Sequence, residues 1–191
     1  MKKFKRRGGV ISTHFSSYEV ELLSSLVLQL VEMVSDGDPQ GFREQAEPVD
    51  PFEAWAQDLA VDPSDPEPQD DPVMQRLFPN AYPHDAAASS DFRRFTERDL
   101  KTKKIAEAEV VLQRLAETQR GTTDVRIPAA EVDQWLRTLT SVRLAVATRL
   151  GITDADSAEE LAELPESDPR AFMLSVYDWL GFAEETLLSA L

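Results

Sequence analysis

The feature that most constrains this chain is a series of apolar stripes at helical spacing, separated by residues that begin and end helices. The clearest stripe covers residues 129–150, with Leu136 and Leu139 on one face and Gly151 as the terminating residue. Such stripes must be buried against one another, so the sequence predicts an all-α protein, mostly a helical bundle. The other predicted helices cover residues 17–35, 73–78, 85–120, 157–164 and 169–191.

The N-terminal residues depart from this helical period. Residues 4–7 and 10–15 flank Gly8 and Gly9, and a two-residue Gly-Gly turn between such runs predicts a small β-hairpin. A lone hairpin is marginal in water, so we expect it to pack on the bundle. Ser16 and Glu19 then form a capping-box pattern that predicts the start of the first helix.

An acidic, proline-rich insert interrupts the helical pattern at residues 36–72, where Arg43 is the single base. Within the insert, residues 62–72 contain no apolar side chain that could anchor them, which favours a flexible loop. We therefore interpret residues 1–191 as a single domain that carries one insert. The sequence does not decide whether the predicted 85–120 helix breaks or kinks near residues 101–104.

Charge and composition exclude several classes of protein. The chain has 35 acidic and 20 basic residues and a net charge of −15, which repels nucleic acid at long range. It has no cysteine, so disulfides, thiolate chemistry and cysteine-bound zinc are excluded. The longest apolar stretch, residues 22–34, contains polar residues and is too short to span a bilayer, so we expect a cytoplasmic protein without membrane contact.

No motif in the sequence predicts catalysis, a cofactor or a metal site. The two histidines, His14 and His84, lie in separate predicted elements and lack metal-ligand spacing. Adjacent acidic pairs point to different faces of a helix, so they cannot act together on one substrate. We therefore expect a protein that is not an enzyme and that binds no cofactor.

Two clusters of bases are present, at residues 2–7 and at residues 93–104. The interpretation that we favour is two solvated faces, and the alternative is contact with phosphates or with an acidic partner. Arg93, Arg94 and Arg98 are the candidates for such a partner contact. Because acids interrupt the second cluster and the chain is strongly acidic, we expect no direct DNA binding.

Arg143 is the one charged residue within the apolar stripe of the predicted 129–150 helix. A buried guanidinium needs a carboxylate partner, because an unpaired buried charge is very costly. Asp99 is the first candidate, since it follows Phe92 and Phe95 at helical spacing, and Asp178 is the second. We expect a structural buried ion pair rather than a ligand site.

Several short runs, taken in order and at their spacing, resemble one family of actinobacterial proteins, known as domain of unknown function 2017. The runs are Phe4-Lys5-Arg6, Leu77-Phe78-Pro79-Asn80-Ala81-Tyr82, Phe92-Arg93-Arg94-Phe95, Trp135-Leu136-Arg137, Arg143-Leu144-Ala145 and Tyr177-Asp178-Trp179-Leu180-Gly181. The resemblance implies transcriptional control of the oxidative-stress response, through contact with an alternative sigma factor and a redox-active cysteine pair. Since this chain has no cysteine, that redox switch does not carry over.

The resemblance leads us to expect a non-enzymatic regulatory protein that contacts a sigma factor or RNA polymerase. The alternatives are an adaptor associated with Clp-type proteolysis, because the family's genes lie near that of the Clp adaptor, and an uncharacterised enzyme. A homodimer is left open by the sequence.

Overall fold

The computed structural model describes residues 1–36, 71–165 and 167–191. Within them lie six α-helices and a small antiparallel sheet, which confirms the predicted helical fold with an N-terminal hairpin. The predicted acidic insert lies outside the described residues except at its two ends. Those ends are ordered, since Asp36 closes the first helix and Asp71 and Pro72 begin the next described one.

The hairpin is part of a three-stranded sheet that the sequence did not predict in full. Strands β1 (Lys5–Arg7) and β2 (Val10–Thr13) pair around the Gly-Gly turn, and β3 (Val125–Pro128) adds to the other edge of β2. Ile11 faces Ile127 across that second pairing, and both side chains are buried. The hairpin is therefore anchored by a strand that lies far away in the sequence.

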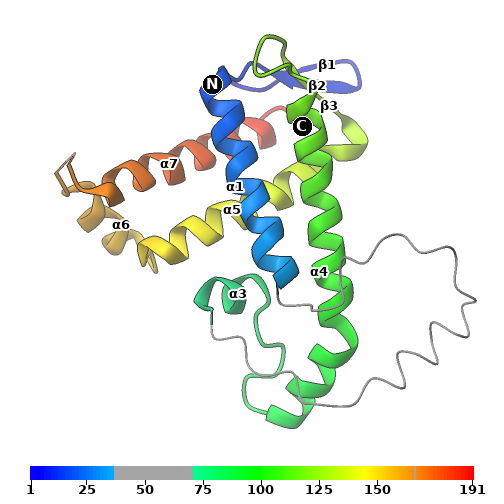
Figure 1. Cartoon of the computed structure of the whole chain (residues 1–191), viewed down its shortest axis with the longest axis vertical. Helices are drawn as coiled ribbons and strands as arrows, with labels where there is room; N and C mark the ends of the chain where they lie inside the picture. Colours follow the sequence, from blue (N-terminus) through cyan, green and yellow to red (C-terminus); the bar gives the residue numbers. More distant parts are fainter. Residues whose placement is uncertain (37–70, 166) are drawn as a thin grey trace, which may run out of the picture.

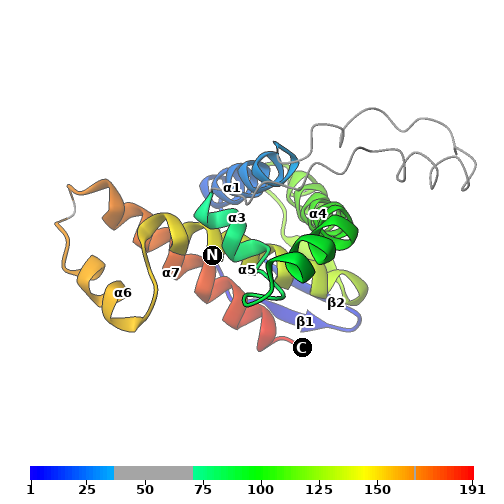
Figure 2. The ribbon, with the colours of Figure 1, turned by 90° about the horizontal axis from the view of Figure 1, so that it is seen from below.

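Four long helices form the body of the molecule (Figure 1): α1 (Ser17–Asp36), α4 (Ala86–Ala116), α5 (Val132–Leu150) and α7 (Pro169–Leu188). Helix α1 packs on α4, while α5 packs on both α4 and α7. Leu23, Trp135 and Leu180 are among the side chains that this packing buries completely. Figure 2 shows α6 (Ala155–Ala162) with the adjoining ends of α5 and α7 on one side of the molecule, away from α1 and α4.

Side-chain caps fix where the helices begin. Ser16 and Glu19 form the predicted capping box at α1, with Ser16 N donating to Glu19 Oε2 at 2.8 Å and Glu19 N to Ser16 Oγ at 3.3 Å. The other caps are aspartates whose carboxylates accept from backbone N–H groups in the first turn. These are Asp71 at α3 (Pro72–Leu77), Asp85 at α4, Asp154 at α6 and Asp168 at α7.

The turn after α4 joins the sheet to the bundle through Gly121. This residue has φ +80°, and a Cβ atom placed on it would lie 2.8 Å from backbone atoms of Phe15, Ser16 and Ser17. Only a residue without a side chain allows the turn to approach the start of α1 so closely. Gly121 therefore positions β3, which follows the turn, beside the hairpin.

Helix α4 is continuous, so the break that the sequence left open near residues 101–104 does not occur. Its N-terminal half extends beyond the end of α1 (Figure 1). In that half α4 lies near α3 and the loop that follows it, including Leu77, Phe78 and Pro79. This extension decides which of its side chains reach solvent.

Candidate functional site

The predicted apolar face of α4 is wrong in its N-terminal half. Phe95 is 71% exposed, Leu100 46% and Phe92 38%, whereas Val111 and Leu115 further along the same helix are fully buried. The reason is the extension of α4 beyond α1, which leaves the first turns without the helix that covers the later ones. Apolar side chains at helical spacing therefore become part of an exposed surface.

The arginines predicted as partner contacts lie on this same part of α4. Arg94 and Arg98 are exposed and Arg93 is half-buried. The guanidinium of Arg94 stacks over the Phe95 ring, with its central carbon 5.4 Å from the ring centroid. We call the surface formed by residues Phe92, Arg93, Arg94, Phe95, Arg98 and Leu100 the α4 surface.

Next to the α4 surface lies a groove of about 370 Å³ between the end of α3, the first half of α4 and α5. We call it the α4 groove. Its apolar lining comes from Leu77, Phe78, Phe92 and Leu100. Its charged lining comprises the cations Arg93, Lys103, Lys104 and Arg137 and the carboxylates Glu97 and Glu107.

Both carboxylates of the groove already have cationic partners. Glu107 accepts a hydrogen bond from Arg137 at 2.9 Å, and Glu97 pairs with the buried Lys101 at 2.8 Å. Lys104 donates from Nζ to Ser141 Oγ at 2.9 Å. Burial lowers the pKa of Lys104, an effect that nearby Glu107 opposes and Arg137 reinforces. The groove thus holds more positive charge than its own carboxylates balance.

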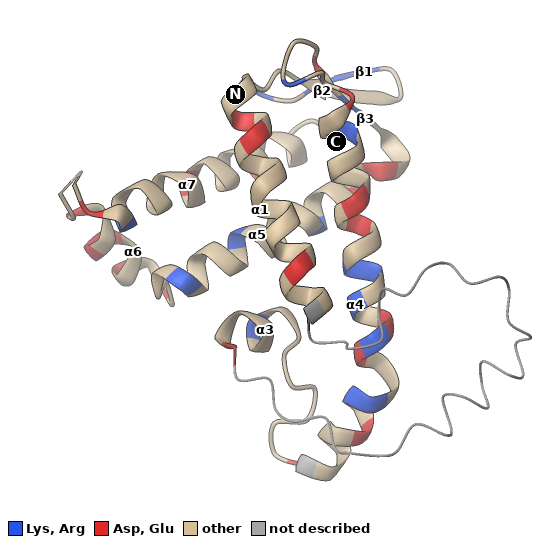
Figure 3. Cartoon of the chain, viewed as in Figure 1, with Lys and Arg blue, Asp and Glu red and all other residues tan. Residues whose placement is uncertain are grey.

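The two basic clusters of the sequence do not lie together. Residues 5–7 form β1 and residues 2–4 lead into it, and the sheet contacts α4 through β3 near the C-terminal end of that helix. Arg93, Arg94 and Arg98 lie near the N-terminal end of α4 (Figure 3). A helix of this length spans about 46 Å at about 1.5 Å per residue. The fold therefore forms no continuous basic surface from the two clusters.

Arg143 is half-buried, and both predicted partners are wrong. Its side chain is 36% exposed and donates from Nη1 to Glu184 Oε2 at 3.3 Å, whereas Asp99 and Asp178 are exposed. Asp99 was expected to face inward with Phe92 and Phe95, but all three side chains are exposed. Asp178 follows Tyr177 by one position, so it lies about 100° around α7 from the face that meets Arg143, on which Tyr177, Gly181 and Glu184 lie.

Three residues at helical spacing on α7 hold the Arg143 side chain. Its guanidinium carbon lies 4.3 Å from the Tyr177 ring centroid, and a Cβ added at Gly181 would lie 3.1–3.3 Å from its guanidinium atoms. Glu184 follows one turn later and accepts its hydrogen bond. The spacing of these residues, i, i+4 and i+7, is the signal that would have identified them in the sequence.

A cavity of about 280 Å³ adjoins Arg143 between α3, α5, α6 and α7. Its lining includes two arginines, Arg76 and Arg143, and two carboxylates, Asp154 and Glu184. Arg76 donates to the carbonyl of Ile152 at 3.1 Å. With these charges balanced internally, the cavity is a polar part of the helix packing and has no net charge that would attract an ion.

The histidines lie apart from the α4 surface. His14 Nδ1 is 3.0 Å from Asp124 Oδ1 beside the sheet, and His84 is exposed in the loop before α4. Within residues 1–36, 71–165 and 167–191, no group of three His, Asp or Glu side chains is placed to hold a metal ion. No described helix is long and apolar enough to cross a membrane.

The fold and the exposed α4 surface together define the class of protein. It is a helical protein with a small three-stranded sheet, in which a long helix extends past its neighbour and exposes aromatic and cationic side chains.

The family follows from the sequence. The model of the family described as "Domain of unknown function (DUF2017)" matches residues 1–191, so the chain belongs to that family. No curated protein and no solved structure matches the chain.

Proposed function

We propose that this chain is a non-enzymatic regulatory protein that acts by binding another protein through the α4 surface. The observation that carries the proposal is the exposure of Phe92, Phe95 and Leu100 beside three arginines. Monomeric proteins rarely leave a contiguous apolar patch exposed without a binding role. Aromatic residues and arginine are the residues most enriched at protein interfaces and among their energetic hot spots.

The charge layout favours a protein partner over DNA. A DNA reader of typical size makes about 6–10 phosphate contacts on one continuous surface. The α4 surface has three arginines, and the N-terminal cluster lies at the other end of α4. In a gel-shift at physiological salt we therefore expect no sequence-specific, submicromolar DNA binding by the isolated chain.

The role in transcriptional control that the family resemblance implies directs the test to the transcription machinery. The full chain is immobilised, and purified RNA polymerase core, individual sigma factors and Clp components of the native host are passed over it. We propose that RNA polymerase or a sigma factor binds. Phe95→Asp should weaken that binding more than about tenfold, because it removes the most exposed aromatic side chain of the surface.

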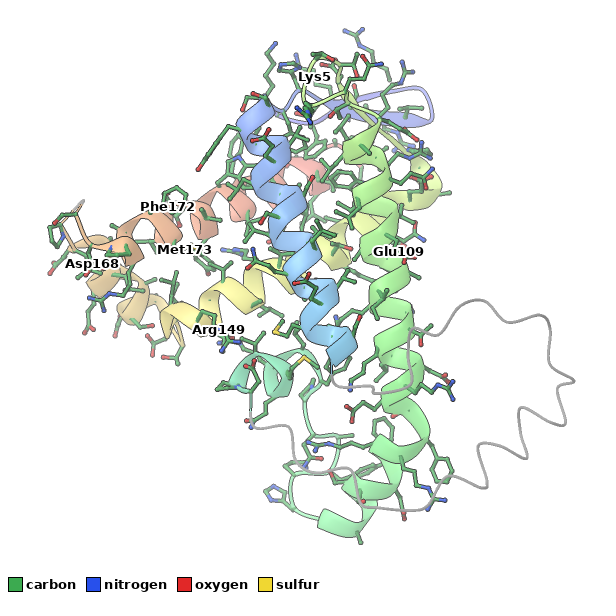
Figure 4. All side chains as sticks on the ribbon, in the orientation of Figure 1. Lys5, Glu109, Arg149, Asp168, Phe172 and Met173 are labelled. Atoms are coloured by element: carbon green, nitrogen blue, oxygen red, sulfur yellow. The ribbon has the colours of Figure 1, made fainter. Side chains whose placement is uncertain are left out.

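Phe172→Asp is the matched control. Phe172 is 51% exposed on α7, and Figure 4 shows it on an element distant from α4. This control should change the affinity less than about twofold. The proposal is wrong if no transcription protein binds, or if both variants have the same effect. Binding to Clp components with loss in Phe95→Asp alone would instead assign the surface to the proteolysis adaptor.

A further inference from the structure

We infer that the α4 groove binds an acidic, amphipathic segment of the partner protein, whose apolar side chains enter the groove while its carboxylates contact Arg93, Lys103 and Lys104. This inference rests on the proposed function and specifies the chemistry of the partner. It follows from the shape of the groove, the charges in its wall and the position of the α4 surface beside it.

The shape of the groove suits bulky apolar side chains. Its volume of about 370 Å³ lies within the range of about 300–1,000 Å³ found for binding pockets. Leu77 lines the groove and is buried, while Phe92 and Leu100 line it and remain partly exposed. An amphipathic helix inserts its apolar side chains into grooves of this kind at i, i+3, i+4 and i+7 spacing.

The cations of the groove wall are available to a carboxylate. Arg93 and Lys103 form no ion pair or hydrogen bond with any other residue that the structure describes. Lys104 donates to a hydroxyl and lies 5.8 Å from the centroid of the Phe78 ring, and it forms no ion pair with a carboxylate that the structure describes, although Glu107 is near enough to favour its charged form. The lowered pKa of Lys104 has burial as its main cause, and an arriving carboxylate would stabilise the charged form.

Glu97 and Glu107 cancel only part of this positive charge, because Glu97 pairs with Lys101 outside the groove lining and Glu107 pairs with Arg137. They also oppose a polyanion that would fill the groove with phosphates. An amphipathic segment with carboxylates beside its apolar stripe can contact both the cations and the apolar lining.

The net charge of −15 does not prevent the binding of an acidic segment. At physiological ionic strength the Debye length is about 8 Å, so acids elsewhere on the molecule are largely screened from the groove. Short-range contacts with Arg93, Lys103 and Lys104 therefore decide the interaction. The apolar lining then favours this segment over acidic segments that lack apolar anchors.

The test uses a fluorescein-labelled peptide of about four helical turns, with Leu and Phe at i, i+3, i+4 and i+7 and Asp or Glu elsewhere. Its binding to the full chain is measured by fluorescence anisotropy at physiological salt. We expect saturable binding that weakens about tenfold in Lys103→Glu and in Leu100→Asp. Both residues are exposed or partly exposed, so the variants should fold, which far-UV circular dichroism verifies.

Lys5→Glu is the matched charge reversal, because Lys5 is exposed in the sheet, away from the N-terminal half of α4 (Figure 4). It should change the affinity less than about twofold. Two control peptides separate the contributions: replacing the apolar residues by Ala, or the acids by Asn and Gln, should each weaken binding about tenfold.

The inference is overturned if the peptide shows no saturable binding at millimolar concentration, or if Lys103→Glu and Lys5→Glu have the same effect. It is also overturned if a single-stranded oligonucleotide binds in place of the peptide. Concentration-dependent dimerisation of the chain that Leu100→Asp abolishes, without peptide binding, would assign the groove to a second copy instead.

These outcomes are separable from those of the proposed function. If RNA polymerase or a sigma factor binds and Phe95→Asp weakens it while the peptide fails, only the partner chemistry inferred here is wrong. If the peptide binds in the groove but no transcription protein does, the groove stands and the regulatory assignment falls.

Discussion

The approach of the α4–β3 turn to the start of α1 makes Gly121 the most informative single position for stability. In Gly121→Ala the new Cβ would lie 2.8 Å from three backbone atoms of the 15–17 segment, which cannot swing aside as the end of a flexible side chain can. Left-handed backbone costs a residue with a Cβ about 1–2 kcal/mol. Overpacking against a fixed neighbour adds about 1–3 kcal/mol.

The expected loss of unfolding free energy is therefore about 3 kcal/mol. For a chain of this size, about 1 kcal/mol lowers the melting temperature by about 2–4 °C, so Gly121→Ala should melt about 6–12 °C lower. Thermal unfolding followed by circular dichroism at 222 nm measures this change. A variant with unfolded strands but intact helices would also be informative, because Gly121 positions β3 beside the hairpin.

Two other glycines allow the cost of backbone strain to be separated from the cost of overpacking. Gly151 has φ +76° with nothing within 4 Å of an added Cβ, so Gly151→Ala should lose about 1 kcal/mol from backbone strain alone. Gly9 lies in open space without positive φ, so Gly9→Ala should stay within about 0.5 kcal/mol of the wild type. If Gly121→Ala melts at the same temperature as Gly151→Ala, the close approach to α1 does not exist.

Two further predictions concern the ion pairs. Glu184→Gln should weaken the pair with the half-buried Arg143 guanidinium and lower stability by about 1 kcal/mol, while Asp178→Asn should change it by less than about 0.5 kcal/mol; equal effects in chemical denaturation would contradict the assigned partner. Arg114 donates to Glu131 from Nε at 2.7 Å and from Nη2 at 2.5 Å, and these bonds lower the pKa of Glu131 although burial opposes them. The stability that this pair contributes is present above the ordinary pKa of 4.5 and is lost as the pH falls through the lowered pKa of Glu131. Glu131→Gln should therefore cost about 1 kcal/mol at pH 7 and much less at a pH below that lowered pKa. Urea titrations that show the same difference between variant and wild type at the two pH values would refute this pH dependence.

The sequence by itself determined most of the secondary structure. Its aspartates mark the starts of α3, α4 and α7, Ser16 and Glu19 cap α1, and Gly8 and Gly9 make the hairpin turn. These features are local, because a cap, a turn or a 3.6-residue stripe involves neighbours within a few positions. For the same reason, β3 escaped prediction: a four-residue strand is identified by its pairing with β2, which lies more than a hundred residues earlier in the chain.

Only the tertiary structure decided what the α4 surface is. A stripe of Phe92, Phe95 and Leu100 on a helix predicts a buried face, and nothing within α4 shows that its first half extends beyond α1. The same applies to Arg143, since the sequence indicates the need for a carboxylate, but the register between α5 and α7 selects Glu184. Periodicity gives the face of a helix on which a residue lies. Whether that face meets another helix or solvent depends on where the neighbouring helices end, which is set by packing across the whole chain.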